Sequence, residues 1–380
     1  MSDRTGPTPN DFIFEGPLGS DGAKVEQIEP AWFKITLGSA PNHPEWPNKL
    51  NFMLKRVPTQ PLVLEVVFDA ANSDMAFNEY PQSYSPDGVN WTQVFWERDR
   101  VQSPGHDFLR LGPLNFPRLY VGTQTPLSNE QLMEKVARWA KSPFATLHTL
   151  GETAEGRKIV RLTITDTTDP HKPARRWAHH VSLQHPGEFN AQWRMVGMIE
   201  WLLSDDPLAA QARRRQVFHF VPTMSPDGPS HGWYRVNASG KDMNRTYLST
   251  GADPQRQEPE AYLVHHDFEE LMNSPTPITT AWAMHTWQGI VEPVMCLGPE
   301  IGTQTGPFEQ FVEIMQKHDA NRLIKPLRQR QGKPRDSSWG QGPFMQYGIS
   351  NILCEGGSFF NKAQNIQSGI AIAKAICEFY

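Results

Sequence analysis

One stretch constrains the fold of this chain more than any other: Val181-Ser-Leu-Gln-His185-Pro-Gly-Glu188-Phe-Asn190. The apolar run over 177–183 is typical of a buried strand, a Pro-Gly pair breaks it, and an amphipathic helical pattern follows over about 190–203. His185 and Glu188 therefore fall at the carboxyl end of a strand, where open α/β sheets bind their ligands. An imidazole and a carboxylate three residues apart across a tight turn can bind one cation, and zinc accepts this ligand mix.

The His-x-x-Glu spacing alone is weak evidence, because the chain has 13 histidines and repeats the spacing at His266 and Glu269. That second pair lies in the charged run 265–270, which is typical of a solvent-exposed helix face. The first pair differs in its position at a strand end and in the residues that follow it.

Length and charge exclude several classes of protein. A chain of 380 residues is long enough for two domains, each with its own core. The 36 Lys and Arg residues against 41 Asp and Glu residues give a net charge of −5, and the longest basic run is only 213–215. This balance argues against nucleic acid as a partner.

The three cysteines, Cys296, Cys354 and Cys377, are odd in number, widely spaced and all in apolar segments. They are expected to be reduced core thiols of a protein in a reducing compartment. The first residues form no apolar signal segment, and no run of about 18 apolar residues occurs. We therefore expect a cytoplasmic protein with no membrane partner.

Residues 1–120 are expected to form a small all-β sandwich domain. Short β-type runs occur at 31–37, 51–55 and 62–68, with Pro- and Asn-rich breaks between them and no helical period. The lone histidines His43 and His106 are interpreted as surface or turn residues. Residues 116–126 are interpreted as the link to the second domain.

Residues 121–380 show a different pattern, in which strands alternate with helices. Predicted strands lie at 158–164, 177–183, 216–221, 278–284 and 349–354, and predicted helices at 128–141, 190–203, 255–272, 307–318 and 363–378. This alternation indicates an α/β domain with a mixed central sheet flanked by helices.

The loop after 216–221 carries polar groups suited to binding a substrate. It contains Pro226-Asp-Gly228, then Arg235, then Asp242-Met-Asn244-Arg245. A guanidinium group grips a carboxylate with two bonds, and a second one beside a metal could hold an oxyanion. A polar, glycine-rich loop without a functional role is the alternative interpretation.

Two further strands also end in groups that suit catalysis. His285 follows the strand at 278–284 and would complete a His/Glu/His ligand set with an open fourth position. Glu355 follows the apolar run at 349–354, where it is well placed as a general base. A structural histidine and a solvated glutamate are the alternatives.

In this order, the motifs resemble those of the zinc carboxypeptidases of the carboxypeptidase A type. The β-rich segment with Ser85-Pro-Asp-Gly-Val-Asn-Trp91 looks like the cytosolic carboxypeptidase branch, the tubulin deglutamylase-like group, which carries a small β-sandwich ahead of its catalytic domain. The resemblance covers about 120–380 well and 1–120 weakly.

The resemblance implies a role for each matching residue. His185, Glu188 and His285 would hold one zinc ion. Glu355 would take a proton from the zinc-bound water and deliver it to the leaving amine, and Arg235 would stabilise the oxyanion. Asn244 and Arg245 would bind the terminal carboxylate of the substrate, which makes such an enzyme an exopeptidase.

The chain departs from the family pattern in several places. Ser225 stands where the family usually has Asn, and Tyr347 lies only eight residues before Glu355, too close for the mobile tyrosine of digestive members. Lys333 and Arg335 lie where members selective for acidic residues carry a basic pocket group. Thr286 and Trp287 are bulkier than usual after the histidine and are expected to narrow the pocket.

The sequence thus predicts a zinc-dependent carboxypeptidase that hydrolyses the C-terminal peptide or isopeptide bond of a peptide or protein tail, with acidic residues as candidate leaving groups. The alternative is a zinc amidohydrolase acting on a small N-acyl amino acid or biosynthetic intermediate. Four tryptophans, Trp233, Trp282, Trp287 and Trp339, would suit an aromatic ligand in that case, and core packing explains them equally well. A catalytically silent binding module is the third interpretation.

Overall fold

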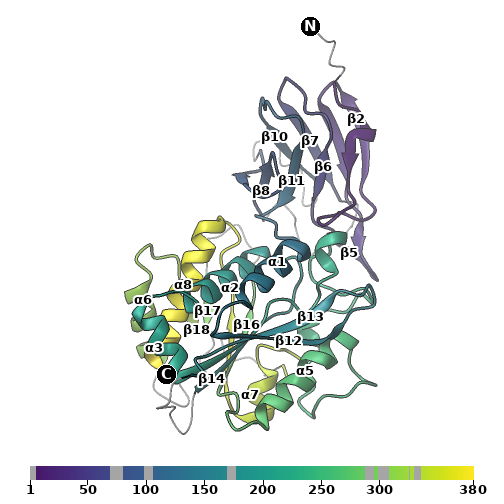
Figure 1. Cartoon of the computed structure of the whole chain (residues 1–380). Coiled ribbons are helices and arrows are strands. Elements are labelled where there is room, and N and C mark those ends of the chain that lie inside the picture. The colour runs from purple at the N-terminus through teal and green to yellow at the C-terminus, as the bar shows by residue number, and fades with distance from the viewer. Residues whose placement is uncertain are drawn as a thin grey trace.

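Two bodies of different secondary structure follow one another along the chain, a β-rich one and a larger α/β one (Figure 1). The computed structural model describes residues 6–68, 80–97, 106–168, 177–286, 295–297, 308–324, 326–328 and 335–380. The predicted fold class, an α/β domain preceded by a smaller β-rich region, is confirmed.

The N-terminal body contains two sheets. One sheet has the strand order β1 (Phe12–Ile13), β6 (Phe52–Leu54), β11 (Leu119–Thr123), β8 (Gln82–Ser85) and β9 (Thr92–Val94). The other has the order β10 (His106–Leu111), β7 (Leu62–Val67), β3 (Trp32–Thr36) and β2 (Lys24–Glu29). Alternate side chains of both sheets, including Phe33, Leu54 and Leu64, meet in one buried core, as expected when each strand buries one face.

The segment 116–126, predicted as a link between domains, contains the strand β11 (Leu119–Thr123). β11 pairs with β6 on one side and β8 on the other, and Leu119 and Val121 point into the sandwich core. The period-two pattern of this strand is short, because only two apolar residues, Leu119 and Val121, alternate on its buried face among Pro and Gly residues. Division of the chain at residues 120 and 121 remains a proposal, and β11 runs across that point to Thr123.

The α/β body is built on a mixed six-stranded sheet. Its strand order is β12 (Ala145–Glu152), β13 (Lys158–Ile164), β15 (Gln216–Val221), β14 (Trp177–Leu183), β16 (Thr280–Met284) and β19 (Ser350–Cys354). The last four strands run parallel, and β12 and β13 are antiparallel to their neighbours. Sequence analysis predicted all of these strands except the edge strand β12, whose side chains are mostly exposed and carry no clear apolar pattern.

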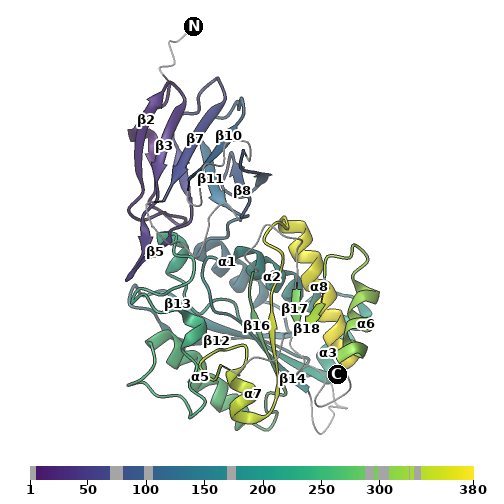
Figure 2. The same cartoon turned by 180° about the vertical axis from the view of Figure 1, so that it is seen from behind.

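Helices cover both faces of this sheet (Figure 2). One face packs on α1 (Asn129–Trp139), α2 (Phe189–Leu202), α3 (Pro207–Arg215), α6 (Phe308–His318) and α8 (Lys362–Phe379). The other face packs on α5 (Pro259–Met272) and α7 (Gly342–Tyr347). The predicted capping box is present, since Ser128 Oγ accepts a hydrogen bond from the backbone N–H of Gln131.

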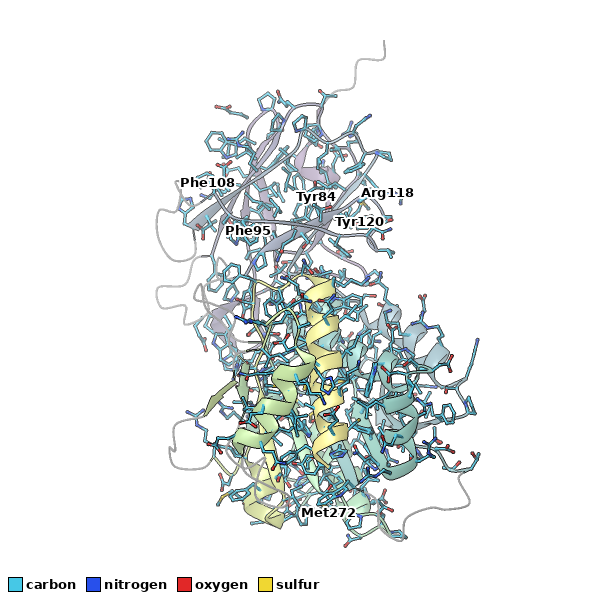
Figure 3. All side chains as sticks on the ribbon, turned by 90° about the vertical axis from the view of Figure 1, so that its left-hand side faces the viewer. Tyr84, Phe95, Phe108, Arg118, Tyr120 and Met272 are labelled. Atoms are coloured by element: carbon cyan, nitrogen blue, oxygen red, sulfur yellow. The ribbon has the colours of Figure 1, made fainter. Side chains whose placement is uncertain are left out.

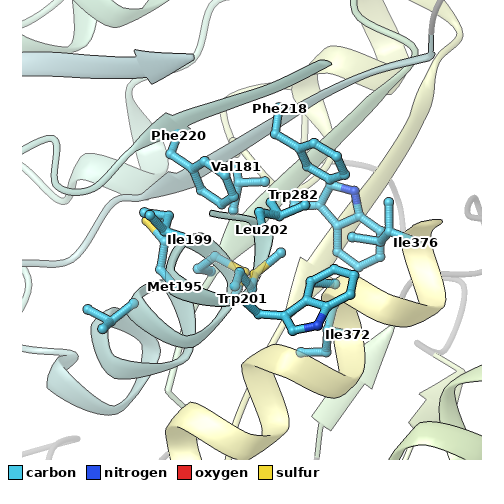
Figure 4. Close-up of a cluster of buried hydrophobic side chains, with 14 of the residues drawn as sticks. Val181, Met195, Ile199, Trp201, Leu202, Phe218, Phe220, Trp282, Ile372 and Ile376 are labelled. Atoms are coloured by element: carbon cyan, nitrogen blue, oxygen red, sulfur yellow. The ribbon is translucent and has the colours of Figure 1, made fainter. Parts of the chain in front are cut away.

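The larger core lies between the sheet and α2 and α8, with Trp282 at its centre (Figure 4). The Trp282 side chain is only 1 % exposed and contacts Phe311 of α6. Cys354 and Cys377 are free and buried, as predicted, whereas the side chain of Cys296 lies outside the described residues. Among the helices that the structure describes, none combines the length and the apolar character needed to cross a bilayer.

The sheet of the α/β body also buries histidines. His179 and His180 on β14 are at most 1 % exposed, and burial lowers the pKa of both to about 3. An unfolded histidine has a pKa of about 6.5. Below that pH the unfolded chain binds protons that the folded chain does not, so the free energy of unfolding falls as the pH falls from about 6.5 towards 3.

We expect the variant His180→Leu to lose less stability on acidification than the wild type. Removing this histidine should flatten the slope of unfolding free energy against pH by up to one proton, about 1.4 kcal/mol per pH unit, between pH 6 and 4.5. Urea unfolding at several pH values measures the slope. His266→Leu, at an exposed site on α5, is the control and should keep the wild-type slope. An unchanged slope in His180→Leu would show that this imidazole already binds a proton in the folded state.

Candidate metal centre and catalytic cleft

Three elements bring His185, Glu188 and His285 together. His185 lies two residues beyond β14, Glu188 immediately precedes α2, and His285 immediately follows β16. β14 and β16 are parallel neighbours in which Leu183 is opposite Met284, so their carboxyl ends meet at one edge of the sheet. The sequence-predicted ligand set is therefore assembled in space.

The ligand atoms of these three side chains form a tight buried group. Glu188 Oε1 is 2.8 Å from His185 Nδ1, Glu188 Oε2 is 2.9 Å from His285 Nδ1, and the two Nδ1 atoms are 3.1 Å apart. Each side chain is only 2 % exposed, and the group is able to hold a metal ion. Two imidazole nitrogens and a carboxylate facing one point form the three-ligand donor set of a catalytic zinc site.

The Pro-Gly turn between the first two ligands packs directly on the 228–245 loop. Gly187 donates a backbone hydrogen bond of 2.9 Å to the Tyr234 carbonyl, and a Cβ atom at Gly187 would lie 2.6 Å from Tyr234 Cα. A Cβ atom at Gly228 would lie 2.3 Å from Pro186 Cβ. Only glycine fits at these two positions without displacing the backbone that carries the ligands.

Asp242 orients His185 from the side opposite Glu188. His185 Nε2 donates to Asp242 Oδ1 over 2.9 Å, which leaves Nδ1 as the nitrogen that faces the ligand group. Arg235 Nε donates to the other carboxylate oxygen over 2.6 Å. Burial would raise the pKa of Asp242, but His185 and Arg235 hold it well below its usual value. The sequence motif 242–245 contains this aspartate but predicts no role for it; its position two residues before Asn244 is the only signal in the sequence.

Glu188 is held by donors on both of its oxygens. The Thr286 backbone N–H donates to Oε2 over 2.9 Å, and the Tyr234 hydroxyl donates to Oε1 over 3.2 Å. Burial would raise the pKa of Glu188, but the two imidazoles lower it well below its usual value. The Thr286 hydroxyl accepts from the Ala191 backbone N–H at the first turn of α2, so its oxygen is directed at the helix. Trp287 lies outside the described residues.

Glu355 follows β19 and is fixed beside His285 by the backbone. The His285 backbone N–H donates to the Cys354 carbonyl, and the Gly356 backbone N–H donates to the His285 carbonyl. Glu355 Oε2 is shielded from solvent and has no hydrogen-bond partner among the described residues. Burial raises the pKa of Glu355 to about 7, although the neighbouring His285 opposes this rise. A carboxyl group with such a pKa can accept and release a proton near neutral pH.

Asn244 and Arg245 follow Asp242 in the same loop and differ in burial. Asn244 is buried, and its Oδ1 accepts from Ser338 Oγ and from the Trp339 backbone N–H, which fixes the amide plane. The Arg245 side chain is exposed at the surface of the loop. Burial of part of its guanidinium lowers the pKa of Arg245, and the positive charges of Arg235 and Arg335 lower it further, so the three guanidinium groups share one region.

The remaining residues singled out from the sequence lie elsewhere. Tyr347 packs against Phe268 near the amino ends of β16 and β19, away from the ligand group. Trp233, Trp282 and Trp339 are buried in cores. The second His-x-x-Glu pair is on α5, where His266 is exposed, whereas Glu269 accepts hydrogen bonds from Ala252 and Gln346. Lys333 lies outside the described residues.

An α/β fold with a buried His/Glu/His group at its strand ends indicates a metal-dependent hydrolase. Residues 129–284 match the model of the zinc carboxypeptidase family, so this part of the chain is similar to the members of that family. Its curated relatives include cytosolic carboxypeptidase 2 of Xenopus tropicalis, 38 % identical over 136 residues, and cytosolic carboxypeptidase 4 of Homo sapiens, 32 % identical over 148 residues. The matched regions cover 35 % and 37 % of this chain but only 14 % and 13 % of those relatives.

Solved structures share the fold over nearly the whole chain. A metallo-carboxypeptidase from Burkholderia cenocepacia superposes with a TM-score of 0.76, covering 95 % of this chain and 98 % of its own, at 20 % sequence identity. A metallo-carboxypeptidase from Pseudomonas aeruginosa in complex with (2-guanidinoethylmercapto)succinic acid gives a TM-score of 0.75 and covers 100 % of this chain and 98 % of its own, at 19 % identity. At these identities the similarity establishes the fold, and it includes the N-terminal β-rich region.

We expect the variant Asp242→Asn to bind zinc more weakly than the wild type. Asparagine keeps an acceptor for His185 but removes the negative charge that strengthens the imidazole as a ligand, and loss of such an outer partner typically costs roughly 10- to 100-fold in metal affinity. Competition with a chromophoric chelator measures the dissociation constant. Asp205→Asn, at an exposed aspartate, is the matched control. Equal dissociation constants for wild type and Asp242→Asn would contradict a role for Asp242 in orienting His185.

Proposed function

We propose that this chain is a zinc-dependent carboxypeptidase that hydrolyses the C-terminal peptide or isopeptide bond of a peptide or protein substrate, with a preference for acidic residues. One observation carries the proposal: a buried His/Glu/His ligand group, a carboxyl group with a pKa of about 7 and three guanidinium groups lie together at the carboxyl ends of parallel strands. This combination brings a metal-binding group, a proton acceptor and an anion-binding surface together at one edge of the sheet.

His185, Glu188 and His285 would hold the zinc ion, which supplies Lewis acidity for polarising a carbonyl group and for lowering the pKa of water. Glu355 is the general base, because its Oε2 is unpartnered and its neighbouring backbone is fixed to His285. It removes a proton from the attacking water molecule and then delivers that proton to the nitrogen of the leaving amine. A carboxyl group that is partly protonated near neutral pH suits both steps.

Arg235 is the group that stabilises the oxyanion of the tetrahedral intermediate. Its Nε is committed to Asp242, so the guanidinium plane is fixed before the substrate binds. A preorganised cation of this kind stabilises developing charge without reorganisation during the reaction. Its guanidinium carbon also lies 6.0 Å from the Trp46 ring of the N-terminal body, which limits its movement from the other side.

Asn244 and Arg245 bind the terminal carboxylate. The oxygen of the Asn244 amide is occupied by Ser338 and Trp339, so its nitrogen is the atom left to donate to a ligand. The exposed Arg245 guanidinium can grip a carboxylate with two parallel hydrogen bonds. Recognition of a terminal carboxylate beside the catalytic group restricts the enzyme to the last residue of its substrate.

The preference for acidic residues is supported by Arg335. This exposed side chain lies close enough to Arg245 to affect its pKa, so a second carboxylate near the terminal one would meet an additional positive charge. The curated relatives quoted above are named cytosolic carboxypeptidases, which supports a cytoplasmic location for this chain as part of the proposal. The alternative of a small-molecule amidohydrolase is not favoured by these relatives.

We expect the zinc-loaded protein to shorten members of a mixed peptide library by their last residue, and Glu355→Gln to bind zinc but to leave the peptides intact. Loss of a general base lowers the rate by roughly 100- to 10,000-fold. Mass spectrometry identifies the residues released, and enrichment of Glu or Asp among them would support the acidic preference. Internal cleavage, or turnover by zinc-replete Glu355→Gln at the wild-type rate, would contradict the mechanism.

We expect Arg245→Ala to lower kcat/KM by roughly 10- to 100-fold on peptides with a free terminal carboxylate, because a charged hydrogen bond contributes about 1.5–3 kcal/mol. The same peptides with an amidated C-terminus provide the comparison, and the variant should treat them as the wild type does. An equal loss on both substrate series would assign Arg245 to a structural role. Arg256→Ala, at another exposed arginine of the α/β body, is the matched control.

A further inference from the structure

The N-terminal body holds the loop that lies against the metal centre. Its backbone N–H groups at Gly19, Asp21 and Lys49 donate to three carbonyls within one turn of the loop, those of Pro229, His231 and Gly232, at 3.0, 2.9 and 2.7 Å. The turn of the β4–β5 hairpin (Ser39–Ala40 and His43–Pro47) reaches the same loop further on, where Asn42 and His43 bond the carbonyls of Ser239 and Gly240. Figures 1 and 2 show this hairpin at the junction of the two bodies.

Lys49 extends from this contact into the space behind the ligand group. Its Nζ lies 3.8 Å from the centre of the Tyr80 ring and 4.4 Å from the centre of the Tyr234 ring, so it interacts with both π faces. The side chain is only 5 % exposed, and Nζ has no hydrogen-bond partner within the described part of the chain. Burial lowers the pKa of Lys49 to about 7, and the charge of Glu188 opposes this shift.

A chain of hydroxyl groups connects the same two tyrosines to a metal ligand. The Tyr80 hydroxyl donates to the Tyr234 hydroxyl over 2.7 Å, and Tyr234 donates to Glu188 Oε1 over 3.2 Å. Both tyrosines are buried, with 3 % and 5 % of their surface exposed. Trp96 and Gln82 fix the Tyr80 backbone from within the N-terminal body, since both donate to its carbonyl oxygen.

We propose that Tyr80 and Lys49 of the N-terminal body are positioning residues of the metal centre, acting on the ligand Glu188 through Tyr234. The proposal rests on the metal site assigned above and extends it across the junction between the two bodies. In this arrangement the β-rich region completes the outer shell of the ligand group, rather than serving only as an attached module.

The physical basis is the orientation of one hydroxyl group. Because the Tyr80 hydroxyl donates its proton to the Tyr234 oxygen, the Tyr234 proton cannot point back at Tyr80 and is directed at Glu188 instead. Hydrogen bonds in such a chain polarise one another, particularly in a buried site. A carboxylate ligand held by an oriented donor keeps its position and charge for the metal, and such outer partners commonly determine metal affinity. The Nζ atom of Lys49 lies over the rings of Tyr80 and Tyr234 and thereby fixes their mutual position.

Zinc affinity of the full-length chain tests this inference through Tyr80→Phe, Tyr234→Phe and the double variant. Phenylalanine keeps each ring, and therefore the packing around Lys49, and removes only the hydroxyl. We expect Tyr234→Phe to raise the zinc dissociation constant roughly 10- to 100-fold, the range typical of lost outer-shell partners, and Tyr80→Phe to raise it by about 3- to 10-fold. If Tyr80 acts through Tyr234, adding Tyr80→Phe to Tyr234→Phe should cause no further loss.

Tyr120→Phe is the control, because this tyrosine of β11 also lies in the N-terminal body (Figure 3) and its ring packs beside Gly88 rather than on Tyr234. It should bind zinc as the wild type does. The metal-free unfolding midpoints of Tyr80→Phe and Tyr120→Phe should agree within about 2 °C, which separates an effect on the site from an effect on the fold.

Three results would overturn the inference: a wild-type dissociation constant in Tyr80→Phe, independent effects that multiply in the double variant, or a loss of affinity matched by a lower metal-free midpoint. The metal site itself is judged by the wild type alone. If the wild type binds no zinc, the proposed function fails together with this inference; if it binds zinc tightly and Tyr80→Phe binds equally tightly, only the role of the N-terminal body fails.

Discussion

The burial of the Glu188 carboxylate between two imidazoles is the interaction on which the rest of the site depends. An uncompensated charge in such a place would cost several kcal/mol, so each of its oxygens needs partners. The two imidazoles, the Thr286 backbone N–H and the Tyr234 hydroxyl provide them from three separate segments of the chain. Each of these segments must therefore be fixed before the ligand group can form, and the parallel strands β14 and β16, ending side by side, fix two of them.

The third segment, the 228–245 loop, has little regular structure of its own. It contains only a one-turn helix, α4 (Gly228–His231), and a short 3₁₀ turn over Met243–Arg245, yet it supplies Tyr234, Arg235 and Asp242. A long irregular loop loses much conformational entropy when it is ordered, and this cost must be offset by contacts. Here the contacts come from the Pro-Gly turn on one side and from the N-terminal body on the other. The fold thus explains why a β-rich region accompanies the α/β domain at this point.

Local sequence patterns predict most of the α/β architecture and the metal-ligand set. The apolar run before His185, the runs before His285 and Glu355, and the helical periods between them lie within a few residues of the observed elements, because each depends on neighbours in sequence. Sequence patterns do not predict strands whose pairing is non-local or whose apolar alternation is weak. The segment of β11 has the composition of a linker, and the exposed edge strand β12 has no clear apolar pattern. The contact of Tyr80 with Tyr234 joins residues 154 apart in the sequence, and no periodicity encodes it. The sequence motif includes Asp242 but does not predict its hydrogen bond with His185, because that contact forms only when the loop folds.

The environment also separates the two carboxylates of the cleft into different roles. Glu188 is surrounded by imidazoles and N–H and O–H donors, which favour its ionised form and hold its pKa well below the usual value. Glu355 is half-buried, its Oε2 is shielded from solvent without a hydrogen-bond partner among the described residues, and its pKa rises to about 7. A ligand has to stay ionised, whereas a general base has to exchange a proton at the working pH, so divergent pKa values are the expected signature of one residue in each role. The difference arises from hydrogen-bond partners rather than from residue type, and one of those partners, the Tyr234 hydroxyl, reaches Glu188 from the loop that the N-terminal body holds in place.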